Sequence, residues 1–246
     1  MDNYVLMKKL GGGPSGSVFL VQHKADGQQF AMKRIVCGSE SKANATLRDA
    51  MSLGKLQHPF VAKYKEFFID VDDSDDNVFV HVVGEYHPCG DLTKLFKKRC
   101  KQQKPFAEPL IKKWFGQMVE ALIFIHDREV VHGSLKPTNV YMTEDLNISI
   151  GDFGVSPSVT GSEASMAAAM AWTPPDDHDG GAKSGADRDG RKDVYALGCI
   201  LLQLVTCHAV DETTMTSLLI QSKTDPRVLE DLLQQIMVSF IWIIDK

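Results

Sequence analysis

The chain of 246 residues is 43% hydrophobic and 24% charged, proportions that exclude collagen-like, coiled-coil and wholly disordered proteins. Its length allows one large domain or two small domains with a substantial core. Because 27 basic side chains stand against 32 acidic ones, the formal net charge of −5 argues against a nucleic acid or an anionic membrane as the partner.

Five cysteines are scattered along the chain without a Cys-x-x-Cys pair, so we expect no disulfide bonds and no zinc site. This cysteine usage fits a reducing compartment, and we expect a cytoplasmic protein. The sequence does not open with the basic and then apolar order of a signal peptide. The late apolar run from Ile236 to Ile244 is far shorter than the roughly 20 residues that a membrane-spanning helix needs.

The first third of the chain has the composition of strands. Short segments with β-branched and aromatic residues are separated by glycine-rich or Asp-Gly turns. They predict strands at Tyr4–Leu10, Val18–His23, Gln28–Val36, Phe60–Phe68 and Asn77–Glu85. One helix is predicted from Ser39 to Lys55. The acidic run from Asp70 to Asp76 is interpreted as a solvated turn, because it lacks the central Gly and the final Glu of an EF-hand loop.

Helical periodicity dominates after Pro88-Cys89-Gly90. Apolar residues at positions 111, 114, 115, 118, 122 and 125 predict a helix with one buried face from Glu108 to Arg128. A second helix is predicted from Lys192 to Thr206, and short strands at Val130–Val131, Asn139–Met142 and Ile148–Ile150. Residues 155–191 are rich in Ser, Ala, Gly and Asp and predict a mobile segment. Strands followed by helices, with a break near residues 87–90, predict an α+β fold of two unequal lobes.

A glycine-rich motif lies between the first two predicted strands. Gly11, Gly13, Gly16 and Val18 form the pattern G-x-G-x-x-G-x-V, in which glycines let backbone amides approach phosphates closely. A Rossmann unit would need a helix directly after this motif. Here a strand and a hairpin follow, and Lys33 lies fifteen residues after Val18. That order contradicts a Rossmann unit and fits the nucleotide lobe of a protein kinase.

Further motifs follow in the order found in protein kinases. The turn after the regulatory helix is similar to Gln57-His-Pro-Phe-Val61, and the hinge is similar to Glu85-Tyr-His-Pro-Cys-Gly-Asp-Leu92. The catalytic loop is similar to His132-Gly-Ser-Leu-Lys-Pro-Thr-Asn139, and the metal-binding motif is similar to Gly151-Asp-Phe-Gly154. The anchoring helix of the large lobe, with its buried acid at Asp193, is similar to Lys192-Asp-Val-Tyr-Ala-Leu-Gly-Cys199. The chain thus resembles the protein kinase superfamily, and within it the NIMA-related serine/threonine kinases.

This resemblance implies a bilobal fold. Residues 1–86 would form an N-lobe with an antiparallel sheet and one helix. Residues 87–246 would form a mainly helical C-lobe, which we expect to be truncated and incomplete after about residue 235, because family members continue for several more helices.

The resemblance also implies that ATP binds between the lobes. The residues implied to contact the nucleotide are Leu10, Gly11, Gly12, Gly13, Pro14, Ser15, Gly16, Ser17, Val18, Ala31, Lys33, Asp49, Glu85, His87 and Tyr141. Lys33 would hold the α- and β-phosphates, and the adenine would lie between Val18, Ala31 and Tyr141. Asn139 and Asp152 would ligate Mg²⁺, a cation that prefers oxygen ligands.

The catalytic loop departs from the family pattern. His132-Gly133-Ser134 stands where the family has His-Arg-Asp, whose Asp accepts or orients the proton of the substrate hydroxyl. Ser134 and Lys136 are therefore the candidate catalytic positions, but a serine hydroxyl is too weak a base at neutral pH. Loss of a general base costs about 10²–10⁴-fold in rate. His132 is expected to pack under Phe153 rather than to act in catalysis.

Four smaller departures accompany it. Asp49 replaces the regulatory-helix Glu that pairs with the strand lysine, and it is one methylene shorter. Pro14 at the loop tip lacks an N–H group. Gly84 occupies the gatekeeper position at the rear of the adenine site, where most kinases have a larger side chain, and predicts a cavity there. Pro174-Pro175-Asp176 replaces Ala-Pro-Glu.

These residues predict an ATP-binding, kinase-like protein that is catalytically impaired and acts as a regulator or scaffold, a pseudokinase. Two alternatives remain open, a weakly active serine/threonine kinase and an interaction module that binds no nucleotide. Retention of Lys33, Asn139 and Asp152 favours nucleotide binding, whereas Gly133-Ser134 argues against efficient transfer. The expected partner is another protein, which the sequence does not identify.

Overall fold

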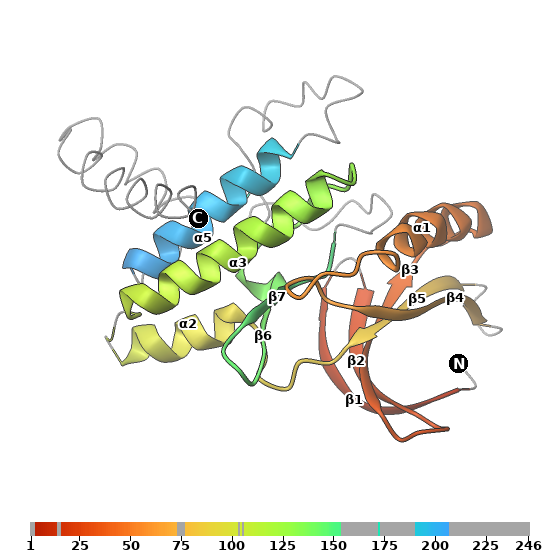
Figure 1. Ribbon diagram of the computed structural model, residues 1–246. Helices are drawn as coiled ribbons and strands as arrows, with labels where there is room; N and C mark the ends of the chain where they lie inside the picture. The colour runs from red at the N-terminus through yellow and green to blue at the C-terminus, as the bar shows by residue number, and fades with distance from the viewer. Residues whose placement is uncertain are drawn as a thin grey trace.

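The computed structural model describes residues 3–13, 16–72, 77–102, 104, 106–153, 172 and 190–206. These residues form a sheet-containing N-lobe and a mainly helical C-lobe (Figure 1). The N-lobe contains β1 (Tyr4–Gly13), β2 (Gly16–His23), β3 (Gln29–Val36), α1 (Glu40–Leu53), β4 (Tyr64–Asp72) and β5 (Asn77–Glu85). The C-lobe contains α2 (Leu92–Lys101), α3 (Glu108–His126), the 3-10 turn η1 (Pro137–Asn139), β6 (Val140–Met142), β7 (Ile148–Ile150) and α5 (Arg191–Thr206). The predicted α+β kinase-like fold is confirmed.

The N-lobe sheet is antiparallel, with the strand order β1-β2-β3-β5-β4. Its register places Val18 opposite Lys33 and Ala31 opposite Gly84. Side chains alternate between the two faces of a strand, so Ala31 and Lys33 share one face with Ile35. That face meets α1, which contributes Ala43 and Ala50 to a buried cluster with β3 and β5. The strand order therefore places the glycine-rich hairpin of β1 and β2, Lys33 of β3 and the end of β5 near one another in the sheet.

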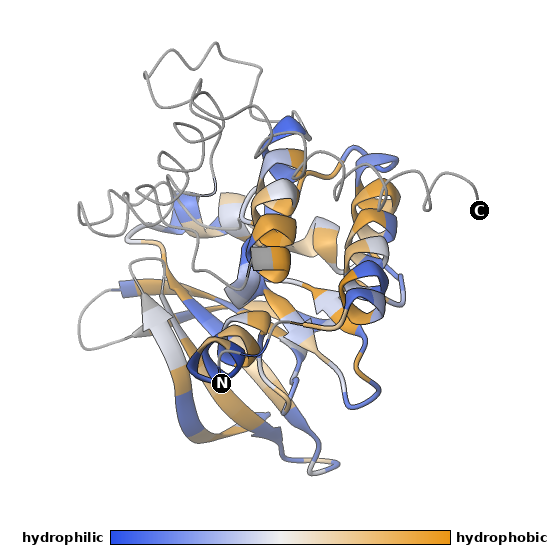
Figure 2. Cartoon of the chain, turned by 90° about the vertical axis from the view of Figure 1, so that its left-hand side faces the viewer, coloured by the Kyte–Doolittle hydropathy of each residue, from blue (hydrophilic) through white to orange (hydrophobic). Residues whose placement is uncertain are grey.

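The core of the C-lobe is built around α3. Trp114, Phe115, Met118 and Ile125 are fully or almost fully buried, as the helical spacing of apolar residues predicted. α5 lies alongside α3 (Figure 1) and adds a further apolar face to the same core. Hydrophobic segments run through both the sheet and the helices (Figure 2). None of the helices in the described ranges has the length and hydrophobicity of a membrane span.

Two of the predicted elements differ from the structure, and one helix was not predicted. The strand expected from Phe60 begins only at Tyr64, because the preceding residues pair with β7 of the other lobe: the Ala62 N–H donates to the Ile150 carbonyl at 2.8 Å, and the Ile150 N–H donates to the Phe60 carbonyl at 2.9 Å.

The predicted strand at Val130–Val131 is wrong. The Val130 N–H donates to the Ile125 carbonyl at 3.0 Å and closes the end of α3, after Glu129 has taken a positive φ of 57°. Helix α2 was not predicted. The residue that indicates the start of this helix is Asp91, whose side chain caps the helix by accepting a hydrogen bond from the Lys94 N–H.

Several predictions lie outside the described residues. Of the segment 155–191, which was expected to be mobile, the structure describes Trp172 and residues 190–191. Pro174-Pro175-Asp176 and the expected incomplete end of the C-lobe also fall outside. So do residues 73–76 of the acidic run, while Asp70 lies within β4.

Candidate functional site

The glycine motif forms the hairpin between β1 and β2. Gly11 pairs with Val18, Gly12 with Ser17 and Gly13 with Gly16, and Leu10 precedes them in β1. Pro14 and Ser15 at the tip lie outside the described residues.

Gly16 is the residue of this hairpin that must be glycine. Its φ is +132°, and a Cβ atom there would lie 2.0 Å from the Arg34 carbonyl oxygen of β3. At Gly16 the backbone of β2 thus lies so close to the backbone of β3 that only a residue without a side chain fits. Around Gly11, by contrast, no atom lies within 4 Å of an added Cβ.

A cavity of about 70 Å³ lies between the lobes, under this hairpin. Its lining residues are Val18, Ala31, Lys33, Ile35, Leu53, Ala62, Lys63, Tyr64, Val82, Gly84, Glu85, Tyr141, Asp152 and Phe153. The structure therefore brings together the three residues expected to enclose adenine, the strand lysine and the Asp of the metal motif. They come from β2, β3 and β6 and from the residues after β7.

Tyr141 lines this cavity and forms a stacked pair with His87, which is not among the lining residues. Their ring centroids are 5.0 Å apart and the rings are inclined by 11°. Burial lowers the pKa of His87, so the imidazole is neutral at physiological pH. Burial also raises the pKa of Tyr141, with Asp152 and Asp91 acting in the same direction. The stack holds the Tyr141 ring flat against the segment that follows β5.

Lys33 and Asp152 join the two lobes at the cavity. The Lys33 Nζ lies 2.5 Å from the Asp152 Oδ1, and both side chains are partly buried. Asp152 has a φ of 54°, a left-handed conformation that is uncommon for a residue with a side chain. Such strained backbone is concentrated at functional positions.

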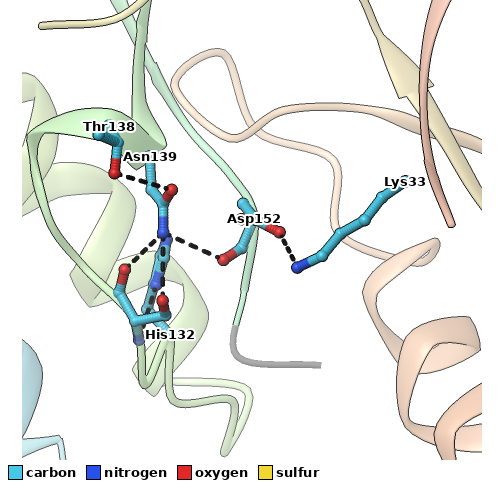
Figure 3. A network of polar contacts seen from close by, with 6 residues as sticks. Lys33, His132, Thr138, Asn139 and Asp152 are labelled. Carbon is cyan, nitrogen blue, oxygen red and sulfur yellow. Dashed lines mark hydrogen bonds and ion pairs between the residues drawn. The ribbon is translucent and has the colours of Figure 1, made fainter. Parts of the chain in front are cut away.

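Asn139 lies on the other side of Asp152 (Figure 3). Its Nδ2 donates to the Ser134 carbonyl at 2.7 Å, to the Ser134 Oγ at 3.2 Å and to the Asp152 carbonyl at 3.4 Å. Asn139 is buried, and the Thr138 Oγ1 lies 3.4 Å from its Oδ1. Ser134, which stands at the position of the missing Asp, is thus hydrogen-bonded directly to the candidate metal ligand Asn139.

His132 packs under Phe153, as predicted. The ring centroids are 4.5 Å apart with an inclination of 22°. Burial lowers the pKa of His132, against the opposing effect of Asp193 and Asp152. Its Nδ1 accepts a hydrogen bond from the Ser134 N–H at 3.3 Å. This geometry gives His132 a structural role in holding the loop and Phe153 together.

Asp193 of α5 anchors the catalytic loop, in agreement with its predicted role as a buried acid. Its side chain is 1% exposed. Its carboxylate accepts from the His132 N–H at 2.8 Å and from the Gly133 N–H at 2.9 Å, and it lies 2.9 Å from the His126 Nε2. The loop is therefore held in place even though its Arg and Asp are absent.

Lys136 is partly buried beside Ser134. Both residues line a second cavity of about 90 Å³, together with residues of α5. This cavity adjoins the catalytic loop on the side of Lys192 and Trp172.

One expected feature is not brought to the site. Asp49 is exposed on α1, whose buried residues are Ala43, Thr46, Ala50 and Leu53, and Lys33 pairs with Asp152 instead of Asp49. Gly84 lines the cavity, as expected, and the Tyr64 ring borders the same space, since an added Cβ at Gly84 would lie 3.4 Å from that ring. Sequence reasoning missed Tyr64, because only the pairing of β4 with β5 places it across from Gly84.

Comparisons with known proteins agree with this arrangement. Residues 4–237 match the family model for the protein kinase domain. The mouse serine/threonine-protein kinase Nek1 is 30% identical over 230 residues, which cover 90% of this chain and 18% of Nek1. Mouse Nek3 is 32% identical over 209 residues, covering 83% of this chain and 38% of Nek3. Rice Nek6 is 27% identical over 256 residues, covering 98% of this chain and 45% of Nek6. The chain spans less than half the length of each of these relatives.

Proposed function

Because the chain belongs to the protein kinase family and is similar to NIMA-related serine/threonine kinases, we propose that it binds Mg-ATP between its lobes and is catalytically impaired. It would then act as a nucleotide-responsive regulator or scaffold of a protein partner in the cytoplasm. The observation that carries this proposal is the row formed by Lys33, Asp152 and Asn139 next to Ser134.

The residues of the cavity suit an adenine nucleotide. Val18 and Ala31 supply apolar contacts from the sheet, and the Tyr141 ring supplies a flat surface from β6. The glycine hairpin offers backbone N–H groups for phosphate oxygens. Lys33 would carry the positive charge that faces the α- and β-phosphates.

The donor set also suits Mg²⁺. This cation is held in such sites by one or two oxygen-bearing side chains together with phosphate oxygens, and Asp152 and Asn139 supply a carboxylate and an amide oxygen. When bound, Mg²⁺ would neutralise charge on the phosphates. The ion pair of Asp152 with Lys33 positions both groups at the same end of the cavity.

Impaired transfer follows from the chemistry of Ser134. Its Oγ accepts a hydrogen bond from Asn139 and has no carboxylate charge to draw a substrate hydroxyl or its proton. Gly133 removes the Arg that would steady the activation segment. The loop keeps its position through Asp193, so the expected result is a formed but chemically weak site.

The proposal is tested by titrating the protein with ATP in the presence and absence of Mg²⁺, followed by calorimetry, and by measuring transfer of radiolabelled phosphate to a peptide. We expect Mg²⁺-dependent binding that Asp152→Asn weakens, because a neutral amide attracts a dication less than a carboxylate does. Asp145→Asn, an exposed Asp in the turn before β7, is the matched control and should bind like the wild type.

We expect transfer at least ~10²-fold below an active relative. If the wild-type protein shows no heat of binding and no thermal shift at saturating Mg-ATP, nucleotide binding is excluded. The alternative of an interaction module that binds no nucleotide would then hold. Turnover near ~1–100 s⁻¹, the usual range of kinases, would exclude catalytic impairment and favour the active-kinase alternative.

A further inference from the structure

Helix α2 presents a row of positive charge to the solvent. Four of its lysines are exposed and are spaced as i, i+3, i+4 and i+7, so they lie on one side of the helix. We call this row the lysine face, and it consists of Lys94, Lys97, Lys98 and Lys101. The opposite side of α2 packs into the core of the C-lobe through Leu92 and Phe96. In Figure 1, α2 is the lowermost helix of that lobe.

Little negative charge balances the lysine face. The Asp91 Oδ2 lies 3.9 Å from the Lys94 Nζ, and that lysine side chain is 73% exposed. Within the described part of the chain, no carboxylate oxygen lies within 4 Å of the other three amines. Glu108, the acid at the start of α3, is paired with Lys112 at 2.7 Å. Since the whole chain has a net charge of −5, the lysine face is a local concentration of positive charge on an acidic protein.

Helix stability accounts for only part of this row. The helix macrodipole favours cations near the C-terminal end, which suits Lys98 and Lys101 in the last turn. Lys94 lies in the first turn, where the dipole disfavours a positive charge. Lysines three or four residues apart also repel each other and weaken a helix. A partner of opposite charge would relieve this repulsion.

The surroundings of the lysine face favour a protein segment over a membrane. A helix that binds a bilayer inserts apolar side chains next to its basic residues. In α2, Leu92 and Phe96 are buried and Leu95 packs against the same core, so the helix exposes no leucine or phenylalanine. A membrane or a nucleic acid is also an extended anionic surface, which the net charge of −5 would repel. A short acidic segment contacts the lysine face alone and avoids that repulsion.

We propose that the lysine face of α2 docks an extended, acidic segment of a partner protein. From Lys94 to Lys101 the helix rises by about 10 Å, a length that an extended segment spans in about three or four residues. Its carboxylates would form ion pairs with the lysine amines. None of the four lysines lines the cavity between the lobes, so this contact does not require nucleotide binding. It would supply the protein contact of the proposed regulator or scaffold.

The binding test uses fluorescence anisotropy with a labelled peptide of eight glutamates, and a peptide of eight glutamines as the neutral control. The wild type should bind the glutamate peptide alone, and more weakly as NaCl is raised from about 50 to 200 mM. Replacing the whole lysine face by Gln should weaken binding at least about tenfold, whereas replacing it by Arg, which keeps the charge, should change binding less than about threefold.

A matched control removes the same charge from exposed lysines outside α2. Its substitutions are Lys8→Gln, Lys24→Gln, Lys42→Gln and Lys55→Gln. This variant should bind the glutamate peptide within about threefold of the wild type, because only distant charges change. Equal losses in the two Gln variants would overturn the docking surface, since binding would then follow the charge of the whole chain.

Two further probes distinguish the class of partner. They are vesicles with about 30% phosphatidylserine and a DNA duplex of about 20 base pairs. Neither should bind as tightly as the glutamate peptide. Binding of either probe that equals the peptide and is lost when the lysine face is replaced by Gln would overturn the assignment to a protein partner.

Thermal unfolding separates docking from helix stability. Replacing the lysine face by Gln should leave the unfolding midpoint within about 2 °C of the wild type, because exposed side chains are lost together with their mutual repulsion. A larger loss would show that these lysines stabilise α2 and would overturn their docking role. Binding of the glutamate peptide by a protein that does not respond to Mg-ATP would support the docking surface while the proposed nucleotide binding fails.

Discussion

The Asp193 carboxylate of α5 accepts a 2.9 Å hydrogen bond from the backbone N–H of Gly133, sixty residues earlier in the chain. Gly133 has a φ of 69°, in the left-handed region, which turns its N–H toward α5 together with that of His132. The catalytic loop therefore depends on one buried carboxylate for its shape, whatever chemistry it performs.

Asp193→Asn should destabilise the protein strongly. The carboxylate accepts from two backbone N–H groups and lies 2.9 Å from His126, whereas an amide has one oxygen and turns its own N–H groups toward the remaining donors. Each buried polar group left unpaired costs about 1–3 kcal/mol. Chemical denaturation should show a loss in that range or larger, while the exposed control Asp127→Asn should stay within about 0.5 kcal/mol. An Asp193→Asn variant as stable as this control would show that the loop is held by other contacts.

Gly16→Ala and Gly11→Ala form a matched pair in the glycine hairpin. The first places a Cβ atom 2.0 Å from the Arg34 carbonyl oxygen at a φ of +132°, whereas the second places a Cβ atom in open space. We expect Gly16→Ala to cost at least about 2 kcal/mol of unfolding free energy and Gly11→Ala to cost less than about 0.5 kcal/mol. Thermal unfolding of both variants measures the difference. Equal stabilities would mean that the hairpin does not approach β3 as closely as described.

Restoring the missing carboxylate should restore only part of phosphoryl transfer. Ser134→Asp supplies a base beside Asn139, but Gly133 still replaces the Arg and Asp49 remains exposed on α1. We expect a rise of at least about tenfold over the wild type, part of the ~10²–10⁴-fold contribution of a general base. Ser134→Ala should leave transfer and stability nearly unchanged, because Asn139 keeps its shorter bond to the Ser134 carbonyl. Any substantial loss of transfer in Ser134→Ala would give the serine a role of its own.

His81 should make the N-lobe sensitive to mild acid. The side chain is 0% exposed, stacks on Phe68 at 4.8 Å, and neither ring nitrogen has a hydrogen-bond partner among the described residues. Burial lowers its pKa from 6.5 to about 4; Arg34 and the N-terminus act in the same direction, and Asp70, 3.6 Å from the Nε2, opposes them.

The unfolded chain therefore binds a proton between pH 6.5 and 4 that the folded chain does not. Stability from this group is fully present above pH 6.5 and falls with decreasing pH, by up to about 3 kcal/mol at pH 4. Denaturation series at several pH values should show this slope in the wild type and a flatter one in His81→Phe, which keeps an aromatic ring. Parallel slopes in the two proteins would contradict a neutral buried imidazole.

Local patterns predicted the elements whose pairing partners are close in sequence. The β1–β2–β3 meander and α3 follow from strand composition, turn residues and helical periodicity, and the kinase resemblance followed from the spacing of several motifs. The stacking of His132 on Phe153 and the burial of Asp193 were also expected from those motifs.

The features that the sequence patterns did not predict depend on packing between residues that are far apart in the chain. Residues 60–62 have strand composition, yet they pair with β7, which lies nearly ninety residues later. Asp49 has the right spacing for an ion pair with Lys33, but the rotation of α1 exposes it. Tyr64 borders the cavity beside Gly84, and it was not predicted there because no local signal fixes the β4–β5 register that sets these two residues opposite each other.

The backbone pairing of Ala62 and Phe60 with Ile150 has a mechanical consequence. The two lobes are joined covalently near His87 and a second time through these hydrogen bonds, so rotation about the line between the two attachments is the relative movement that breaks neither. Asp152 follows Ile150 by two residues in the C-lobe, whereas Lys33 is carried on β3 of the N-lobe. The distance between the Lys33 Nζ and the Asp152 carboxylate would thus increase as the lobes open and would measure that movement.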